Sequence, residues 1–533
     1  MPADMHDPEV LTAAGRRTVP DLLREGVQRT PERPLLVFDD LDGGVRAFSW
    51  SEVSAHAHTV AATLAELGVG PGDRVHVHLP NRPEFLFWWF GTGLRGSAIV
   101  PTNVASSVAE LEYILQHVGA SVSVTDAANL DVVRAARAGA GLADVTLTCD
   151  VPSVGAADES AAVVAAPLDD LAIMYTSGTT SRPKGVRVTH ANYIFAGESV
   201  AASLALAPDD RFLVALPLFH ANAQYYSVMS TLVSGGTVIL AARFSASRWV
   251  DTAIAHRATV GSLFSAPIRM ILAQQSQPHW RENALRVVAF AQNITDREAE
   301  AWEREIGVPL LQLYGMTETI GPPIVNSLWG RRRHDALGRV VLGYRCRIVD
   351  PEGASVRAGK TGELEVGGIP GISLMAGYLK DPVATEATMR DGWLRTGDLV
   401  REDADGLISF VTREKDMIKR AGENIAASEI EEVLLAHPSV SDAAVVGVPD
   451  AMRDETIVAF VVTRDGPVDE PGLREWCGYR LASFRVPEFF AGIETLPRTS
   501  VGKVQKQVLR DLWPAPAGEA QAAGDSAGEP RLR

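Results

Sequence analysis

The stretch Tyr175-Thr-Ser-Gly-Thr-Thr-Ser-Arg-Pro-Lys-Gly185 has the composition of a loop that holds phosphate. Its eleven residues include five Ser or Thr hydroxyls, two glycines and one lysine. Hydroxyls and accessible backbone N–H groups can surround phosphate oxygens, and Lys184 supplies a mobile positive charge. The apolar residues 171–174 predict a short buried strand in front of the loop. A polar surface loop has the same composition, so this stretch alone leaves both interpretations open.

The order of residues in the stretch excludes a Walker A loop, because Lys184 is followed by Gly185 and not by Ser or Thr. The stretch resembles the phosphate loop of the acyl-adenylate-forming (ANL) superfamily, which includes acyl-CoA synthetases, peptide-synthetase adenylation domains and firefly luciferase. Ser181 departs from the pattern, since the family usually has glycine there. Besides Lys184, the resemblance assigns ATP-phosphate contacts to Thr176, Ser177, Gly178, Thr179 and Thr180.

A second motif, Tyr314-Gly-Met-Thr-Glu-Thr319, matches the same superfamily. Tyr314 offers an aromatic face to adenine, and Gly315 permits close approach of the backbone. Thr317 offers a hydroxyl to phosphate, and Glu318 supplies an oxygen ligand suited to Mg²⁺. Each residue alone could be structural, but their combination predicts an ATP and magnesium site.

Adenine and ribose contacts are expected from two further segments. Residues 287–293 occupy the place where the family has a glycine-rich turn against adenine, and Asn293 is the candidate contact there. The segment Gly392-Trp-Leu-Arg-Thr-Gly-Asp398 ends in a carboxylate after a tight turn, which is most often just a surface aspartate. The resemblance implies that Asp398 accepts both ribose hydroxyls and that Arg413 approaches the ribose.

The acyl substrate is expected near the residues that follow an apolar strand predicted over 212–216. A histidine in such a place is usually a hydrogen-bonded core residue, but the resemblance sets His220 beside the acyl pocket. The candidate substrate contacts are Asn222, Gln224 and Tyr225. Their polarity predicts a substrate with hydrogen-bonding groups rather than a plain alkyl chain.

The chain of 533 residues is too long for one domain by the usual size of domains. Alternating helical and strand patterns predict an α/β fold, with a large N-terminal layered α/β domain over residues 1–414. The resemblance to the family's hinge sets the boundary after residue 414 and implies that residues 415–512 form a small, mobile C-terminal α+β lid domain. The composition of residues 513–533 predicts a disordered tail. The Gly91-Thr-Gly-Leu-Arg-Gly96 match to a dinucleotide fingerprint follows a helical pattern and precedes a strand, so we expect a packed helix end there.

Two lysines are assigned to the smaller domain by the resemblance. Lys415 is the expected hinge about which the lid rotates, and Lys503 is the expected catalytic lysine that bridges the carboxylate and the α-phosphate of ATP. An exposed lysine is ordinarily only a solubilising residue, so neither role follows from residue type. With Lys503, the residues expected to act in catalysis are Lys184, His220 and Thr317.

Charge and cysteine content limit the partners of the protein. The net charge of −16 argues against binding to nucleic acid or to an anionic membrane surface. The three cysteines are far apart, with no Cys-x-x-Cys, so neither a disulfide framework nor a zinc site is indicated and inert thiols are expected. The N-terminus lacks a signal-peptide pattern and no apolar run is long enough to span a membrane, which predicts a soluble cytoplasmic protein.

The resemblance implies an AMP-forming ligase that uses ATP and Mg²⁺ to adenylate a small polar or aromatic carboxylate, with CoA as the expected acceptor. The motifs are most similar to those of the bacterial crotonobetaine and carnitine CoA-ligase branch. An alternative from the same branch is a diazotase of natural-product biosynthesis, which activates nitrite and transfers it to an aryl amine. The polar pair Gln292-Asn293 and the altered Ser181 are compatible with that alternative without requiring it.

Overall fold

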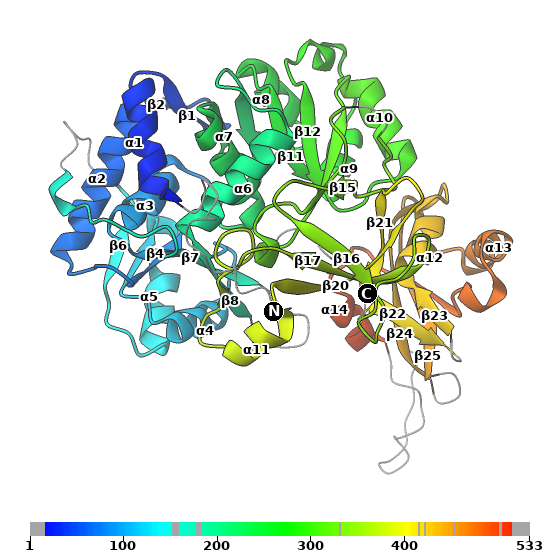
Figure 1. Ribbon diagram of the computed structural model, residues 1–533. Coiled ribbons are helices and arrows are strands. Elements are labelled where there is room, and N and C mark those ends of the chain that lie inside the picture. The colour runs from blue at the N-terminus through cyan, green and yellow to red at the C-terminus, as the bar shows by residue number, and fades with distance from the viewer. Residues whose placement is uncertain are drawn as a thin grey trace. The chain divides into compact units, whose positions relative to one another are not determined.

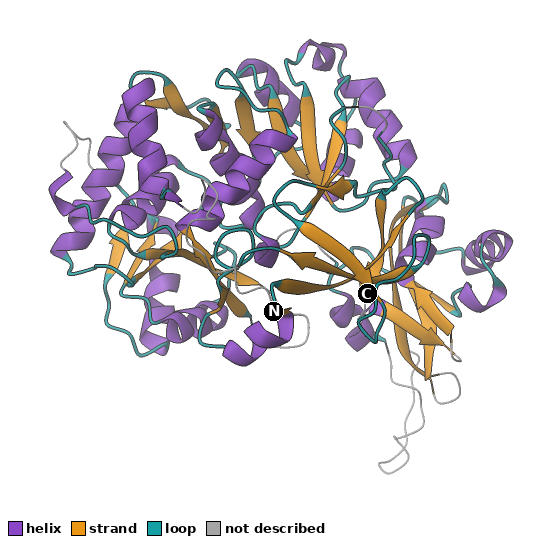
Figure 2. Cartoon of the chain, viewed as in Figure 1, coloured by secondary structure: helices purple, strands orange, loops and turns teal. Residues whose placement is uncertain are grey.

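The computed structural model describes residues 16–151, 159–176, 183–329, 332–413, 416–420, 423–450, 454–499 and 504–513. The chain divides into two compact units, residues 1–396 with 400–410, and residues 397–399 with 411–533. The predicted fold class is confirmed, since a large α/β unit precedes a smaller α+β unit (Figures 1 and 2). None of the helices in the described ranges is long and apolar enough to cross a membrane.

The larger unit contains a nine-stranded sheet that is parallel through its centre, from β13 to β1. Antiparallel strands complete both of its edges. In spatial order the strands are β15 (Arg339–Val340), β14 (Ile324–Val325), β13 (Leu310–Tyr314), β12 (Val287–Ala291), β11 (Val260–Phe264), β9 (Arg211–Val214), β10 (Thr237–Ala241), β1 (Pro34–Asp39) and β2 (Val45–Ser49).

A seven-stranded sheet forms the second β layer of this unit. It is parallel in the middle and ends on one side in antiparallel strands. Its order is β18 (Gly377–Tyr378), β8 (Lys184–Thr189), β7 (Asp170–Thr176), β4 (Ala98–Pro101), β3 (Arg74–His78), β5 (Val122–Thr125) and β6 (Thr146–Thr148). The hydroxyl-rich stretch of the sequence therefore joins two neighbouring antiparallel strands, β7 and β8.

Alternating side chains place both faces of the nine-stranded sheet in apolar cores. On β9, Phe212 and Val214 join the main core, whereas Leu213 joins a second core on the opposite face. The main core also takes in both sheets and the helices between them, which are α1 (Val19–Arg29), α2 (Trp50–Glu66), α3 (Pro83–Leu94), α6 (His190–Ser203) and α7 (Met229–Ser234). The outer face of the sheet is covered by α8 (Trp249–Ala255), α9 (Ser265–Leu272) and α10 (Asp296–Ile306) (Figure 1).

The outer face of the seven-stranded sheet packs against α4 (Val108–Val118) and α5 (Leu130–Gly139), so the unit is layered α/β/α/β/α. Several helices begin at a Ser or Thr whose side chain accepts from the N3 backbone, as Ser107 does for α4 and Thr189 for α6. The glycine-rich segment near residue 91 is the end of α3, as predicted. A Cβ on Gly91 would lie 2.5 Å from Cβ of Val60, so the glycine allows α2 and α3 to pack closely.

A third, smaller sheet contains the division between the two units, which falls within β20 and β21. It contains β16 (Arg345–Val349), β17 (Thr361–Gly367), β20 (Trp393–Glu402), β19 (Met389–Arg390) and β21 (Ile408–Arg413). Helix α11 (Pro382–Thr388) lies between β18 and β19 in the chain.

The second unit is a five-stranded sheet with helices on both faces. Its strands are β23 (Glu423–Ala426), β22 (Met417–Arg420), β25 (Asp454–Thr463), β24 (Val440–Asp450) and β26 (Phe489–Gly492). Helices α12 (Ala427–Leu435) and α13 (Glu470–Arg480) share one core with it, and α14 (Lys506–Leu512) shares another.

The three cysteines are free thiols in the structure. Cys149 and Cys477 are buried, Cys346 is partly buried, and none forms a disulfide. Burial raises the pKa of Cys149 and of Cys346 to about 12, and that of Cys477 to about 11, so all three stay protonated at neutral pH.

Candidate active site

The ends of the predicted phosphate loop are fixed by the pairing of β7 with β8. Thr176, the last residue of β7, is paired with Lys184, the first residue of β8. The ammonium of Lys184 lies 4.9 Å from the centroid of the Tyr378 ring, which is close enough for a cation–π contact. The remaining predicted loop residues, Ser177, Gly178, Thr179 and Thr180, lie outside the described residues, as does Ser181.

Helix α4 holds both ends of this loop. The hydroxyl of Tyr113 donates to the carbonyl oxygen of Pro183 at 3.0 Å, and Nδ1 of His117 shares a hydrogen bond of 2.6 Å with the hydroxyl of Tyr175. The two residues are four apart on one helix face, and their rings are stacked with a centroid distance of 5.8 Å. Burial lowers the pKa of His117, with a further lowering from Lys380, so the imidazole is neutral at pH 7.

The other candidate residues follow the carboxyl ends of parallel strands in the nine-stranded sheet. His220 and Asn222 come after β9, Asn293 after β12, and Tyr314 and Gly315 at the end of β13. In an open parallel sheet these strand ends meet at one edge, where ligands bind. The fold therefore brings the predicted adenine and acyl contacts to one edge of the sheet.

Gly315 allows a close approach that no larger residue could make without movement. A Cβ at this position would lie 2.3 Å from the hydroxyl oxygen of Tyr226, 3.2 Å from the carbonyl oxygen of Gly321 and 3.4 Å from Cα of Pro322. The backbone after Tyr314 is thus held against the helix that follows β9.

The short helical turn η7 (Thr317–Thr319) holds the predicted metal ligand. Glu318 is buried, and its Oε1 accepts a hydrogen bond of 3.0 Å from the hydroxyl of Tyr378. Tyr344 donates to the carbonyl oxygen of Thr319 at 2.6 Å, which braces the same turn. Among the described residues, no group of three or more His, Cys, Asp or Glu side chains could hold a metal by itself. One carboxylate fits Mg²⁺, which usually binds through one or two carboxylates together with substrate phosphates.

The candidate substrate residues lie in η5 (Asn222–Val228), which is a π-helix, a rare form often found at functional sites. Asn222 is buried, and its Oδ1 accepts from the hydroxyl of Ser262 at 2.9 Å. Within the part of the chain that the structure describes, Nδ2 of Asn222 and the hydroxyl of Tyr225 have no hydrogen-bond partner. A buried donor without a partner costs about 1–3 kcal/mol, so a polar substrate group that reached either atom would gain that energy.

Gln224 is different, because both ends of its amide are used inside the protein. Its Oε1 accepts from Tyr193 at 2.5 Å, and its Nε2 donates to the carbonyl oxygen of Leu218 at 2.6 Å. In this arrangement Gln224 supports the wall of the site, and its predicted contact with substrate stays a prediction.

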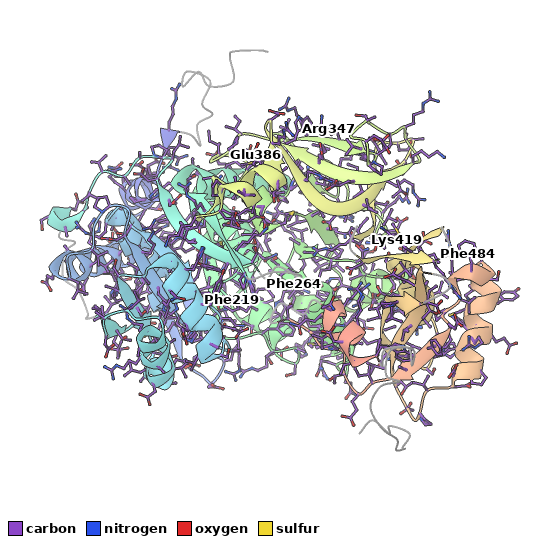
Figure 3. The ribbon with its side chains drawn as sticks, turned by 90° about the horizontal axis from the view of Figure 1, so that it is seen from below. Phe219, Phe264, Arg347, Glu386, Lys419 and Phe484 are labelled. Atoms are coloured by element: carbon purple, nitrogen blue, oxygen red, sulfur yellow. The ribbon has the colours of Figure 1, made fainter. Side chains whose placement is uncertain are left out.

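His220 lies beside Phe219, and their ring centroids are 4.0 Å apart. Phe219 and Phe264, the last residue of β11, both pack against the main core, and Figure 3 labels the two rings in the same region of the larger unit. The histidine is thus set in an aromatic wall at the end of β9.

The predicted adenine turn is polar and strained. Gln292 has a φ of 74°, a left-handed conformation that favours glycine and fits the glycine-rich turn of the family. Its Oε1 accepts from the hydroxyl of Ser265 at 2.8 Å, and Gln312 donates to Oδ1 of Asn293 at 3.1 Å. Both side chains of the pair are therefore held by neighbouring segments of the sheet edge.

The second unit contains the predicted ribose residues. The side chain of Asp398 is 5% exposed, and its Oδ1 lies 3.1 Å from Nε of Arg413. The ion pair joins a buried carboxylate to a more exposed guanidinium. The predicted hinge Lys415 and catalytic lysine Lys503 lie outside the described residues.

Sequence reasoning missed Tyr378, which contacts the predicted site residues Lys184 and Glu318. It also missed Tyr113 and His117, which contact Pro183 and Tyr175 at the two ends of the phosphate loop. Each of these three residues lies outside the sequence motif of the residue that it contacts, so no motif could indicate the contact. Tyr378 could have been found only from the pairing of β18 with β8. This pairing joins segments 190 residues apart in the chain, through the register Gly377↔Arg187.

Comparisons with known proteins agree with this architecture. A family model described as "AMP-binding enzyme" matches residues 23–379, and a second, described as "AMP-binding enzyme C-terminal domain", matches residues 429–503. The chain is 37% identical over 497 residues to a crotonobetaine/carnitine–CoA ligase of Salmonella paratyphi A, a match that covers 90% of this chain and 96% of the relative.

Two solved structures show the same fold. ATP-bound MatB from Rhodopseudomonas palustris superimposes with a TM-score of 0.84 at 29% identity, covering 92% of this chain and 98% of that one. The o-succinylbenzoate CoA synthetase MenE from Bacillus subtilis, in complex with ATP and a magnesium ion, gives a TM-score of 0.81 at 29% identity, with coverage of 92% and 99%.

Proposed function

This chain belongs to the AMP-binding enzyme family of AMP-forming acyl-CoA ligases, and on that premise we propose that it activates a small polar or aromatic carboxylate. The observation that carries the proposal is the pair of buried polar atoms, Nδ2 of Asn222 and the hydroxyl of Tyr225, at the carboxyl end of β9. A plain alkyl chain would leave both atoms without a partner, at a cost that a polar substrate avoids. The names of the relatives agree, since carnitine and o-succinylbenzoate are small and carry polar groups.

The first step joins the acid to AMP. An oxygen of the substrate carboxylate attacks the α-phosphorus of ATP, the bond between the α- and β-phosphates breaks, and pyrophosphate leaves. No protein nucleophile is required, so catalysis consists of positioning and charge neutralisation. Lys184 would neutralise phosphate charge and the loop hydroxyls would donate hydrogen bonds to phosphate oxygens. Glu318 would hold Mg²⁺, which when bound would supply further positive charge.

The second step transfers the acyl group to CoA. The CoA sulfur attacks the acyl carbon, AMP leaves, and the thiol proton passes to solvent. The roles of Asp398 with ribose, of Lys415 as a hinge and of Lys503 at the α-phosphate rest on the family resemblance and stay predictions. Rotation of the smaller unit between the two steps is likewise a proposal.

The diazotase alternative gains no support from the comparisons, because the relatives are named as CoA ligases and synthetases. Among the described residues, nothing at the end of β9 favours nitrite over a carboxylate. The alternative therefore enters only as one arm of the test.

The test is pyrophosphate release from Mg-ATP with a panel of acids, each with and without CoA. The panel pairs polar acids, such as carnitine and o-succinylbenzoate, with alkyl acids of matched size, and a separate arm contains nitrite with an aryl amine. We expect turnover that depends on a polar or aromatic acid and that yields a CoA thioester. Preference for the alkyl acids would refute the substrate class, and turnover that requires nitrite and ignores CoA would refute the ligase assignment.

A further inference from the structure

Tyr378 lies between two residues that the proposed function assigns to ATP and its metal. Its hydroxyl donates to Oε1 of Glu318 at 3.0 Å, and its ring lies 4.9 Å from the ammonium of Lys184. Antiparallel pairing of Tyr378 with Val186 on β8 fixes the position of its backbone. One side chain thus contacts both the predicted metal ligand and the cation of the phosphate loop.

The hydroxyl of Tyr378 is the donor of the hydrogen bond to Glu318. A tyrosine hydroxyl carries one hydrogen to donate and a carboxylate oxygen accepts, so the two groups are matched in chemistry.

A carboxylate with one oxygen fixed by a donor has a restricted orientation. Glu318 is 6% exposed and Tyr378 is 8% exposed, so water does not compete strongly for this hydrogen bond. Partners of this kind orient metal-ligating carboxylates, and their loss typically weakens metal affinity or activity about 10- to 100-fold.

Resting on the proposed function, we propose that Tyr378 is a positioning residue. Its hydroxyl binds Oε1 of Glu318 and so orients the carboxylate toward Mg²⁺, and its ring face holds the Lys184 ammonium. The two contacts use different parts of the side chain. The hydroxyl acts on the metal ligand, and the ring acts on the lysine. Substitutions can therefore separate the two effects.

Tyr344→Phe is the matched control for Tyr378→Phe. Both tyrosines are buried, and both donate to the η7 region, but Tyr344 donates to the backbone carbonyl oxygen of Thr319 and not to the carboxylate. Each phenylalanine keeps the ring and its packing and removes one hydroxyl. A loss caused only by a weakened turn would be the same in both variants.

The primary measurement is the affinity for ATP as a function of Mg²⁺ concentration, by calorimetry and without acid or CoA. In Tyr378→Phe we expect half-saturation by Mg²⁺ to require about 10-fold more metal. Because the ring remains, the affinity for ATP at saturating Mg²⁺ should stay within about threefold of the wild type. Tyr344→Phe, which weakens only the turn, should shift the Mg²⁺ curve by much less than Tyr378→Phe.

A Tyr378→Phe curve that coincides with the wild-type curve would overturn the proposal, as would an equal shift in Tyr344→Phe. Glu318→Gln provides a second test, since it removes the charged ligand but keeps an acceptor for Tyr378. In that background, Tyr378→Phe should cause no further change in Mg²⁺ dependence, and a further 10-fold change would place its effect elsewhere.

Failure of the proposed function would be seen separately. The ligase assignment would be refuted if the wild-type protein bound Mg-ATP but none of the carboxylates caused it to release pyrophosphate. The role of Tyr378 would still be decided by the binding curves alone.

Discussion

Replacing Gly315 with alanine tests how closely the adenine segment packs against the π-helix. The added Cβ would lie 2.3 Å from the hydroxyl oxygen of Tyr226, about 1 Å closer than normal contact. Tyr226 is 6% exposed, so its hydroxyl has little room to move. Gly315 is not among the glycines with positive φ, so an alanine here is strained by contact and not by its backbone conformation. Overpacking of this kind costs about 1–3 kcal/mol.

Removing the hydroxyl of Tyr226 should relieve most of that cost. In the Tyr226→Phe background the closest remaining contact of the alanine Cβ is the carbonyl oxygen of Gly321 at 3.2 Å, which a small shift accommodates. We therefore expect Gly315→Ala to be less destabilising in Tyr226→Phe than in the wild type, with a coupling energy of about 0.5–3 kcal/mol.

Urea unfolding followed by circular dichroism measures the coupling, and the KM for ATP reports the displacement of Tyr314. Gly315→Ala alone should raise that KM, and the double variant should recover part of the loss. Equal destabilisation by Gly315→Ala in both backgrounds would refute the contact between Gly315 and the Tyr226 hydroxyl. Gly119→Ala, a site where an added Cβ meets nothing within 4 Å but φ is positive, separates backbone strain from overpacking.

The remaining predictions concern the smaller unit and one buried histidine. Lys503→Ala should depress formation of the acyl-adenylate far more than formation of the thioester from a supplied acyl-adenylate, and equal losses would contradict the assignment. Asp398→Ala should mainly raise the KM for ATP, whereas an unchanged KM would count against a ribose contact. Burial lowers the pKa of His190 to about 4, below its usual 6.5. Keeping this imidazole neutral contributes about 3 kcal/mol to the free energy of unfolding. That stability is fully present above pH 6.5 and is lost as the pH falls toward 4. In His190→Gln, the urea concentration at the midpoint of unfolding should therefore fall less between pH 6.5 and pH 4 than it does in the wild type.

Most of the fold could be predicted because strand and helix patterns are local. The predicted strand over 212–216 corresponds to β9, which ends two residues earlier, before the turn that includes Pro217. Successive side chains of Phe212, Leu213 and Val214 enter different cores. A strand buried on both faces needs a continuous apolar run, and that run is present in the sequence. The π-helix was not predicted, because a widened turn has no distinct hydrophobic period within seven residues.

The candidate site was predicted only where a contiguous motif carried it. The segment around Glu318 contains several residues of matching chemistry in a row, so its role could be inferred from the resemblance. The polarity of Asn222 was visible in the sequence, but the bond from Ser262 that fixes its amide was not. That bond depends on the pairing order of β9 and β11, which are not consecutive in the chain but are neighbours in the sheet.

Tyr378 shows why motif residues alone do not define such a site. Its contact with Lys184 depends on the register of β18 against β8, and its contact with Glu318 depends on the turn after β13. A shift of β18 by one residue would turn the tyrosine to the other face of the sheet, even though every motif residue would be unchanged. A chain that kept the motifs but lost this register should therefore still match the family while binding Mg-ATP less tightly. Tyr378→Phe reproduces part of that loss, the loss of the hydroxyl contact, without altering the register, which makes its Mg²⁺ curve a direct measure of what the strand pairing contributes to the site.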